Sequence, residues 1–240
     1  MHAATHPTID AGPTDARPVV LEEHDDGGRL LSSTELVDGL PHGRMQRYGP
    51  EGRLQMEACY VQGRLDGLLC LHGEQGEIVQ KAQYRQGLQH GLTRIYAMQR
   101  CIAEQRYVAG QLHGESVMFD DAGQPSARLR YVEGRLEGQA VFLQQGRVVR
   151  KANYRNGLLD GESTDLDAEG TVIQIAHHVA NVLHGPTRRY WPDGGLMDEV
   201  VYRMGKPVAP PARFDQKGRP LAADEATPGV LARLEKLIRG

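Results

Sequence analysis

One short motif recurs through most of this 240-residue chain and constrains its fold more than any other feature. Tyr60–Gly67 reads YVQGRLDG, and variants of it return every 23 or 24 residues, for example as YVAGQLHG and YVEGRLEG. Its first position is held by Leu36, Tyr60, Tyr84, Tyr107, Tyr131, Tyr154, His178 and Tyr202. Because self-similarity at a fixed period of about 20–50 residues is typical of repeat architectures, we expect one structural unit per copy.

Glycines keep the same register in these units. The first glycine of the motif is Gly39, Gly63, Gly87, Gly110, Gly134, Gly157 and Gly205, and Asn181 replaces it once. The second is Gly43, Gly67, Gly91, Gly114, Gly138, Gly161 and Gly185, with Ala209 in the last unit. A third marks most unit centres, at Gly52, Gly76, Gly123, Gly146, Gly170, Gly194 and Gly218. Since glycine and asparagine tolerate positive φ, the glycine pair is predicted to reverse the chain once and the third glycine a second time.

The segments between the two turns are predicted to be β-strands. Counting back from Tyr60, Ala58 lies on the same face as the tyrosine, whereas Cys59 and Glu57 lie on the other. This period of two is that of a half-buried strand. A single hairpin buries too little apolar surface to be stable, but stacked hairpins support one another. The predicted fold is therefore all-β, an elongated, solenoid-like array of antiparallel β-hairpins.

The ends of the chain are expected to differ from this array. Residues 1–18 are polar and proline-bearing and are predicted to be a disordered tail. The repeat domain is predicted to span residues 19–222, beginning with a degenerate hairpin, VVLEEH followed by DDGGR. Residues 223–240 are predicted to form a short amphipathic helix that caps the last hairpin, with partner docking or a dimer contact as the alternatives. Its apolar face would carry Val230, Leu231, Leu234, Leu237 and Ile238.

Composition narrows the possible classes of function. The formal net charge is −3, which gives no reason to expect nucleic acid or an anionic membrane as the main partner. We expect no signal peptide and no membrane span, because no basic start with an apolar run and no apolar segment of about 20 residues is present. The three cysteines, Cys59, Cys70 and Cys101, are expected to be buried thiols in a reducing cytoplasm, with a disulfide or metal role as the alternative.

Catalytic chemistry is not predicted. His42, His90, His113 and His184 stand just before the second glycine, where other units have Asp66, Glu137 and Asp160. Equivalent positions in adjacent hairpins lie roughly 10 Å apart, which is too far for one metal ion. His177 and His178 should point to opposite faces of a strand. No nucleophile elbow or phosphate-binding loop is present, so we expect no enzyme, cofactor or metal.

Two rows and one turn are candidate partner-binding elements. The first row, three residues before each tyrosine, is mixed in charge and would be either a solvated face or a contact face. It includes Lys81, Glu104, Arg128 and Lys151, with Arg130 and Arg150 beside it and the turn acids Asp120 and Asp121. The second row lies four residues after the second glycine and would be core or an exposed apolar stripe with charged ends. It contains Leu71, Ile95, Met118 and Phe142, flanked by Arg47, Asp165 and Arg189.

The repeat resembles a known family. The pattern Y-x-x-G-x-x-x-G, followed by an aromatic residue and a central glycine turn, is similar to the MORN-repeat variant of bacterial YwqK-like antitoxins, from about Leu36 to Leu221. The chain lacks the Y-x-G start of plainer MORN repeats and has one tryptophan, Trp191. One unit has Gln99 and Arg100 in place of the central glycine.

The resemblance implies a cytoplasmic antitoxin or immunity protein that binds a cognate toxin, such as a secreted effector, and blocks it sterically. Two other classes remain open. A scaffold or membrane-associated interaction module is the alternative, although no polybasic segment favours lipid binding. An enzyme or its regulatory half is the third, although the chain offers no second domain for it. The toxin and the oligomeric state are not determined by the sequence.

Overall fold

The computed structural model describes residues 17–221, and the regular structure of this part of the chain is entirely β-strand. The strands pair antiparallel with their neighbours along the chain, which confirms the predicted all-β array of hairpins. Contacts divide the chain between Gln99 and Arg100 into two compact units, which we describe separately. The predicted C-terminal helix and nearly all of the predicted N-terminal tail lie outside the described residues.

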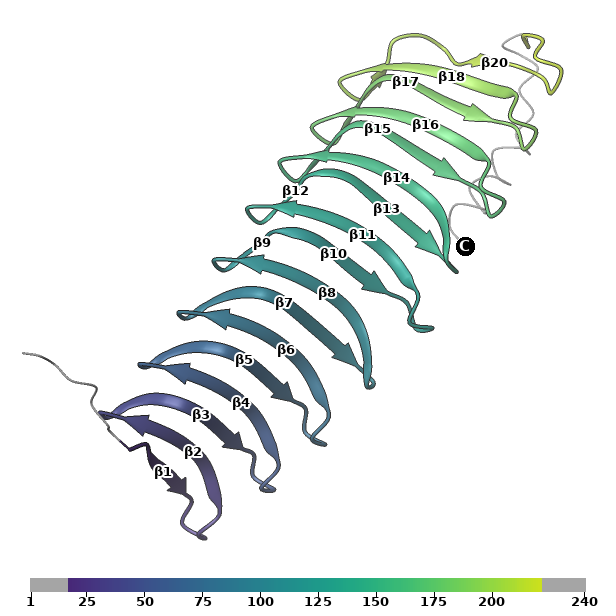
Figure 1. The fold of residues 1–240 in the computed structure, drawn as a ribbon. Helices are drawn as coiled ribbons and strands as arrows, with labels where there is room; N and C mark the ends of the chain where they lie inside the picture. The colour runs from purple at the N-terminus through teal and green to yellow at the C-terminus, as the bar shows by residue number, and fades with distance from the viewer. Residues whose placement is uncertain (1–16, 222–240) are drawn as a thin grey trace, which may run out of the picture. The chain divides into compact units, whose positions relative to one another are not determined.

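The first unit is a sheet of seven strands in chain order (Figure 1). The strands are β1 (Val19–His24), β2 (Leu30–Val37), β3 (Leu40–Tyr48), β4 (Leu54–Val61), β5 (Arg64–His72), β6 (Ile78–Arg85) and β7 (Leu88–Ala97). β1 and β2 form the degenerate hairpin that the sequence predicts at the start of the array.

The second unit repeats this arrangement, and in three of its hairpins one strand is divided into two segments. Its strands are β8 (Arg100–Val108), β9 (Gln111–Leu112), β10 (Gly114–Phe119), β11 (Pro125–Val132), β12 (Arg135–Leu136), β13 (Gly138–Gln144), β14 (Arg147–Arg155), β15 (Leu158–Leu166), β16 (Val172–Val179), β17 (Val182–Tyr190), β18 (Leu196–Arg203), β19 (Lys206–Pro207) and β20 (Ala212–Arg213). The pairs β9 and β10, β12 and β13, and β19 and β20 each share one neighbouring strand.

The two glycines of the motif have different roles. Gly63 has φ +77° and follows Gln62 at φ +49°, so the chain reverses in a two-residue turn with both central residues in the left-handed region. Asn181 takes the same conformation at φ +70°. Gly67 lies within the next strand, at φ +117°, where the register shifts between the pairs of Tyr60 and Ala58. The prediction that both glycines reverse the chain is therefore wrong for the second, which relieves crowding in a bulge.

Backbone hydrogen bonds link these turns to the hairpin before them in the same unit. The amide of Gly63 donates to the carbonyl of Pro41 at 2.7 Å, and that of Gly87 to the carbonyl of Leu65 at 2.7 Å. In the second unit, Asn181 donates to Leu159 in the same way at 2.8 Å. Gly134, Gly157 and Gly205 make the equivalent bond, so in these copies one turn amide fixes a hairpin to the hairpin before it.

Aspartates and arginines stabilise the other set of turns, which lie at the opposite ends of the strands. Asp25 Oδ1 accepts hydrogen bonds from the amides of Gly27 and Arg29, both at 2.9 Å. The Arg29 guanidinium donates to the carbonyl of Pro50, in the next such turn, at 2.8 Å. Arg53 and Arg147 make the equivalent bond, each to a carbonyl 21 residues on. In the repeat without a third glycine, Met98 and Gln99 supply the positive φ instead, at 49° and 63°.

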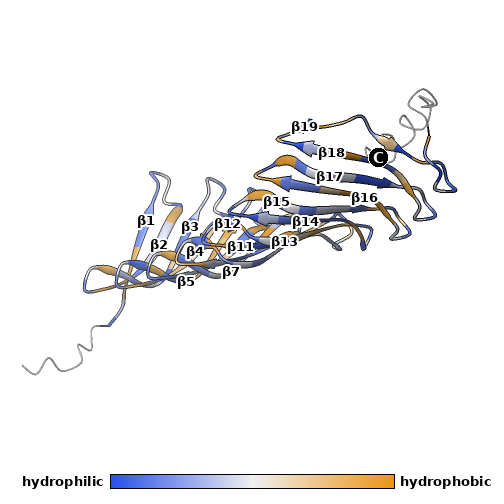
Figure 2. Cartoon of the chain, turned by 90° about the horizontal axis from the view of Figure 1, so that it is seen from above, coloured by the Kyte–Doolittle hydropathy of each residue, from blue (hydrophilic) through white to orange (hydrophobic). Residues whose placement is uncertain are grey.

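Small side chains form the core, and they all lie on one face of the strands. We call this the tyrosine face, because it carries both Tyr60 and Ala58, and we call the other the opposite face. The central row of the tyrosine face in the first unit is the cross-strand series Thr34, Met45, Ala58, Leu69, Ala82 and Thr93. Ala58 and Ala82 are fully buried although the described strands form a single layer. Larger residues on the same face must close over them, and hydrophilic and hydrophobic residues accordingly mix within strands (Figure 2).

Candidate binding surface

The predicted apolar row lies on the tyrosine face of the first unit, beside the small core residues. Leu71 stands between Met56 and Gln80 on its neighbouring strands, and Ile95 lies opposite Gln80. Leu71 and Ile95 are both half-buried. The two interpretations offered by the sequence, core or exposed stripe, therefore combine, because a single-layer sheet covers the sides of these residues and leaves their tips in solvent.

In the second unit the same row contains a more exposed residue, Met118, while Phe142 is half-buried like Leu71 and Ile95. Met118 lies between Ala103 and Ala127, and Phe142 lies between Ala127 and Arg150. Because the alanine side chains are short, the larger side chains rise beside them, and Met118 is 47% exposed. Met118 and Phe142 thus form an apolar strip over a floor of small residues.

Beyond Phe142 the row becomes polar through a series of paired side chains. It continues through Arg150, Asp165, Gln174, Arg189, Asp198 and Arg213. Arg150 lies 3.3 Å from Asp165 Oδ1, and Gln174 donates to Asp165 Oδ2 at 3.3 Å. Arg189 Nε donates to Asp198 Oδ1 at 2.9 Å, and Asp198 is only 4% exposed. We call this series the polar row. The sequence predicted Asp165 and Arg189 in it but placed Arg150 with the mixed-charge face, which is wrong because Arg150 lies opposite Phe142 and Asp165.

Burial shifts the pKa of two groups near Arg150, namely Asp165 and His178. Desolvation raises the pKa of Asp165 above its usual range, against the opposing effect of Arg150. Desolvation lowers the pKa of His178, and the positive charge of Arg150 and His177 adds to this effect. His178 occupies the motif's tyrosine position, and its buried Nδ1 has no hydrogen-bond partner. The site therefore favours neutral histidine.

The mixed-charge candidates lie on the opposite face. Lys81, Glu104 and Arg128 each directly adjoin a buried alanine along their strands, so their side chains point away from the tyrosine face. Lys151 and Arg130 lie on this face by the same alternation. Arg128 forms an ion pair with Glu115 at 3.2 Å, and Glu57 in the same row pairs with Arg44 at 3.0 Å. Several charges on this face are therefore partnered within the sheet.

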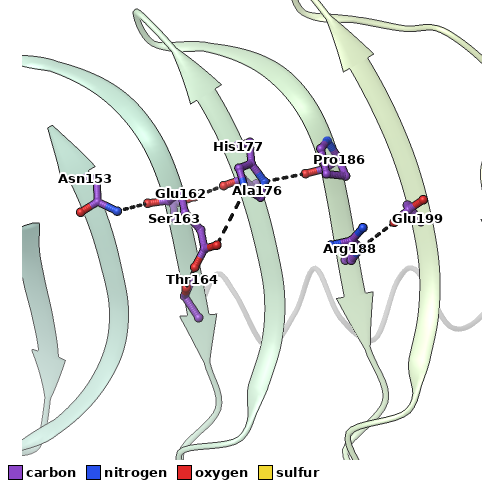
Figure 3. A network of polar contacts seen from close by, with 9 residues as sticks. All are labelled: Asn153, Glu162, Ser163, Thr164, Ala176, His177, Pro186, Arg188 and Glu199. Atoms are coloured by element: carbon purple, nitrogen blue, oxygen red, sulfur yellow. Dashed lines mark hydrogen bonds and ion pairs between the residues drawn. The ribbon is translucent and has the colours of Figure 1, made fainter. Parts of the chain in front are cut away.

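A network of polar contacts extends this pairing across β14 to β18 (Figure 3). Asn153 donates to the carbonyl of Glu162 at 2.9 Å, and the Glu162 carboxylate lies 3.7 Å from His177 Nε2. His177 Nδ1 lies 3.1 Å from the carbonyl oxygen of Pro186. His177 thus contacts groups on the opposite face, whereas its neighbour His178 lies on the tyrosine face, as predicted.

The two candidate turn acids serve their own part of the fold. Asp120 Oδ1 accepts hydrogen bonds from the amides of Ala122 and Gln124, at 3.0 and 2.8 Å. The carbonyl of Asp121, rather than its carboxylate, accepts a bond from the Arg100 guanidinium. The Asp120 carboxylate therefore stabilises the turn that it begins. The sequence did not predict this role, although aspartates recur at the equivalent positions Asp25, Asp167 and Asp215.

The acids in the column before the second glycine also stabilise turns. Asp66 accepts a hydrogen bond from the amide of Gln86 at 3.0 Å, and Glu137 from that of Asn156 at 2.8 Å. Asp160 accepts from Ala180 at 3.3 Å. Within residues 17–221, no three His, Cys, Asp or Glu side chains are grouped so that they could hold a metal ion.

The cysteines differ from their prediction. Cys59 is exposed, and Cys70 and Cys101 are half-buried. The expectation that all three are buried is wrong because Cys59 lies on the opposite face of β4, where no second layer within the described residues covers it. Burial raises the pKa of the Cys70 thiol.

Comparisons with known proteins add no family to these observations. A scan against protein-family models finds no match, and a search of curated proteins finds none either. The resemblance to MORN repeats therefore depends on the repeat residues themselves. Across the described residues, no helix is long and apolar enough to cross a membrane.

Proposed function

We propose that this chain is a non-catalytic, protein-binding repeat protein that acts as a cytoplasmic antitoxin or immunity protein. It would bind a cognate toxin with the tyrosine face and cover the toxin's functional surface. The observation that carries this proposal is the apolar strip of Met118 and Phe142, which lies beside charged groups on one face of a single-layer sheet. An apolar centre with a polar rim is the usual composition of a protein-binding surface.

Ion pairs and exposed guanidinium groups occur on both faces, so the apolar strip, rather than charge pairing, distinguishes the tyrosine face. On the opposite face, Arg128 and Glu57 already have partners within the sheet, and so does Glu199, which pairs with Arg188. On the tyrosine face, the Arg150 side chain remains 42% exposed despite its contact with Asp165. A partner that places apolar residues over Phe142 and a carboxylate near Arg150 would therefore satisfy both groups.

The first test is recovery of a partner from the native host. The tagged full-length chain is expected to co-purify with one protein in a stoichiometric complex, and that protein is expected to be toxic when expressed alone. Co-expression of the full-length chain should remove the toxicity. Recovery of no stoichiometric protein, or of a protein whose expression is harmless, would contradict the antitoxin proposal.

A further inference from the structure

The strand at the start of the array leaves one of its edges without a neighbour among the described residues. β1 pairs with β2 from Val19 opposite Leu36 to His24 opposite Leu30, and it pairs with no other described strand. All six of its residues are exposed, including Val19 at 64%, Val20 at 55% and Leu21 at 51%. Within residues 17–221, this edge of β1 therefore presents backbone donors and acceptors without strand partners, together with apolar side chains, which is the arrangement that recruits another strand.

The other end of the described array is protected in the way that sheet edges usually are. The last strands there, β19 and β20, have two residues each, and Pro207 lies within the first of them. Pro210 and Pro211 follow in the connection between them. Proline lacks the amide that a further strand would need, so this end resists pairing. The two ends thus differ, and only β1 offers a regular strand.

We infer that β1 is the contact through which two copies of this chain associate, by antiparallel pairing about a twofold axis at Val20. Such an axis places one residue opposite its own copy, so few registers are possible. With Val20 opposite Val20 of the second copy, Val19 faces Leu21, Pro18 faces Glu22, and Arg17 faces Glu23. Apolar residues then meet across Val19–Leu21 and each arginine meets a carboxylate, while Pro18, which lacks an amide, limits backbone pairing at the two ends of the interface.

The neighbouring registers are less favourable. An axis at Leu21 places Val20 opposite Glu22 and Val19 opposite Glu23. An axis at Glu22 brings two like charges together, which destabilises a strand pair. Only the axis at Val20 combines matched apolar pairs with opposite charges. The short strand limits the interface, so the dimer is expected to be weak and to depend on protein concentration.

The test is sedimentation velocity of the full-length chain over a range of concentrations, compared with two lysine variants. Val20→Lys places two ammonium groups opposite each other and should raise the dimer dissociation constant at least about tenfold. Val208→Lys introduces the same charge at an equally exposed valine (55%) near the protected end and should leave the constant within about twofold. A wild-type chain that is monomeric throughout, or two variants that behave alike, would overturn the inference.

A crosslinking experiment tests the register and does not depend on how Val20→Lys folds. Val20→Cys should give a disulfide-linked dimer under mild oxidation, because residue 20 would face its own copy. Glu22→Cys, on the same strand and face, should give no more of this dimer than wild type, which contains the exposed Cys59. Equal crosslinking of the two variants would exclude the axis at Val20.

Discussion

At the scale of single residues, the glycines of the motif determine how closely neighbouring strands can approach. Gly67 has φ +117°, and a Cβ added there would lie 3.0 Å from the Cβ of Cys59. Both the backbone conformation and the crowding therefore require glycine. Gly63, four residues earlier, is less restricted, because a Cβ there would meet only Leu40 Cδ2, at 3.8 Å. The two glycines of one motif should consequently respond differently to substitution.

We predict that Gly67→Ala lowers the free energy of unfolding by roughly 1–3 kcal/mol, as expected for a forced positive φ. The matched control is Gly63→Asn, which introduces the residue found at the equivalent position Asn181 and should change it by less than about 0.5 kcal/mol. Urea denaturation of the three proteins measures both values. An equal loss in the two variants would mean that the second glycine has no special role.

The lowered pKa of His178 leads to a prediction of how the free energy of unfolding depends on pH. Its pKa is lowered in the folded state, chiefly by burial, so folding favours the neutral imidazole. Its contribution is present above the unfolded pKa of about 6.5 and is lost as the pH falls through the lower folded value. His178→Tyr restores the usual motif residue, so the variant should lose less stability than wild type between pH 7.5 and pH 5.5. Thermal denaturation at the two pH values provides the comparison, and equal losses would contradict this role.

At the scale of elements, the hairpin turns show which features a sequence can reveal. The 24-residue period and the alternation before Tyr60 predicted the strands, because both follow directly from backbone geometry. The bulge at Gly67 could not be predicted, since glycine is equally compatible with a turn and a bulge. The ladder of arginine bonds was missed because Arg29, Arg53 and Arg147 contact a carbonyl 21 residues away, which has no local signature.

Candidate site residues were predictable in position but not in role. The alternation assigned Phe142 and Arg128 to different rows, and the structure places these rows on opposite faces. How far Phe142 is exposed depends on the alanines beside it and on the absence of a second layer among the described strands, which no local pattern reports. The polar row can be recognised as a continuation of the predicted stripe only when the register of the strands is known.

The aspartate that begins a central turn should stabilise that element measurably. Asp120→Ala removes an acceptor for two turn amides, and we expect a loss of about 1 kcal/mol in the free energy of unfolding. Asp121→Ala is the matched control, because its backbone carbonyl still accepts the Arg100 bond. Chemical denaturation compares the two. Similar losses would show that the turn does not depend on the Asp120 carboxylate.

At the scale of the whole molecule, the repeats of each described unit provide broad faces on which side chains stand in rows. Within each unit the strands are fixed by their neighbours, so the side chains of one row stand at regular cross-strand positions. A large, pre-ordered face can bind a partner without the cost of ordering a flexible chain. The proposed function depends on this property, and the decisive question is which face binds.

The most direct measurement is the affinity of the purified partner for two variants that alter opposite faces of the second unit. Met118→Asp and Phe142→Asp, tested singly, place a carboxylate on the apolar strip, and Arg150 opposite Phe142 can accommodate the new charge. Each should weaken binding at least tenfold, about 1.4 kcal/mol. The double variant Arg128→Glu, Lys151→Glu should bind within about threefold of wild type. The account is contradicted if the double variant loses binding while both strip variants retain it.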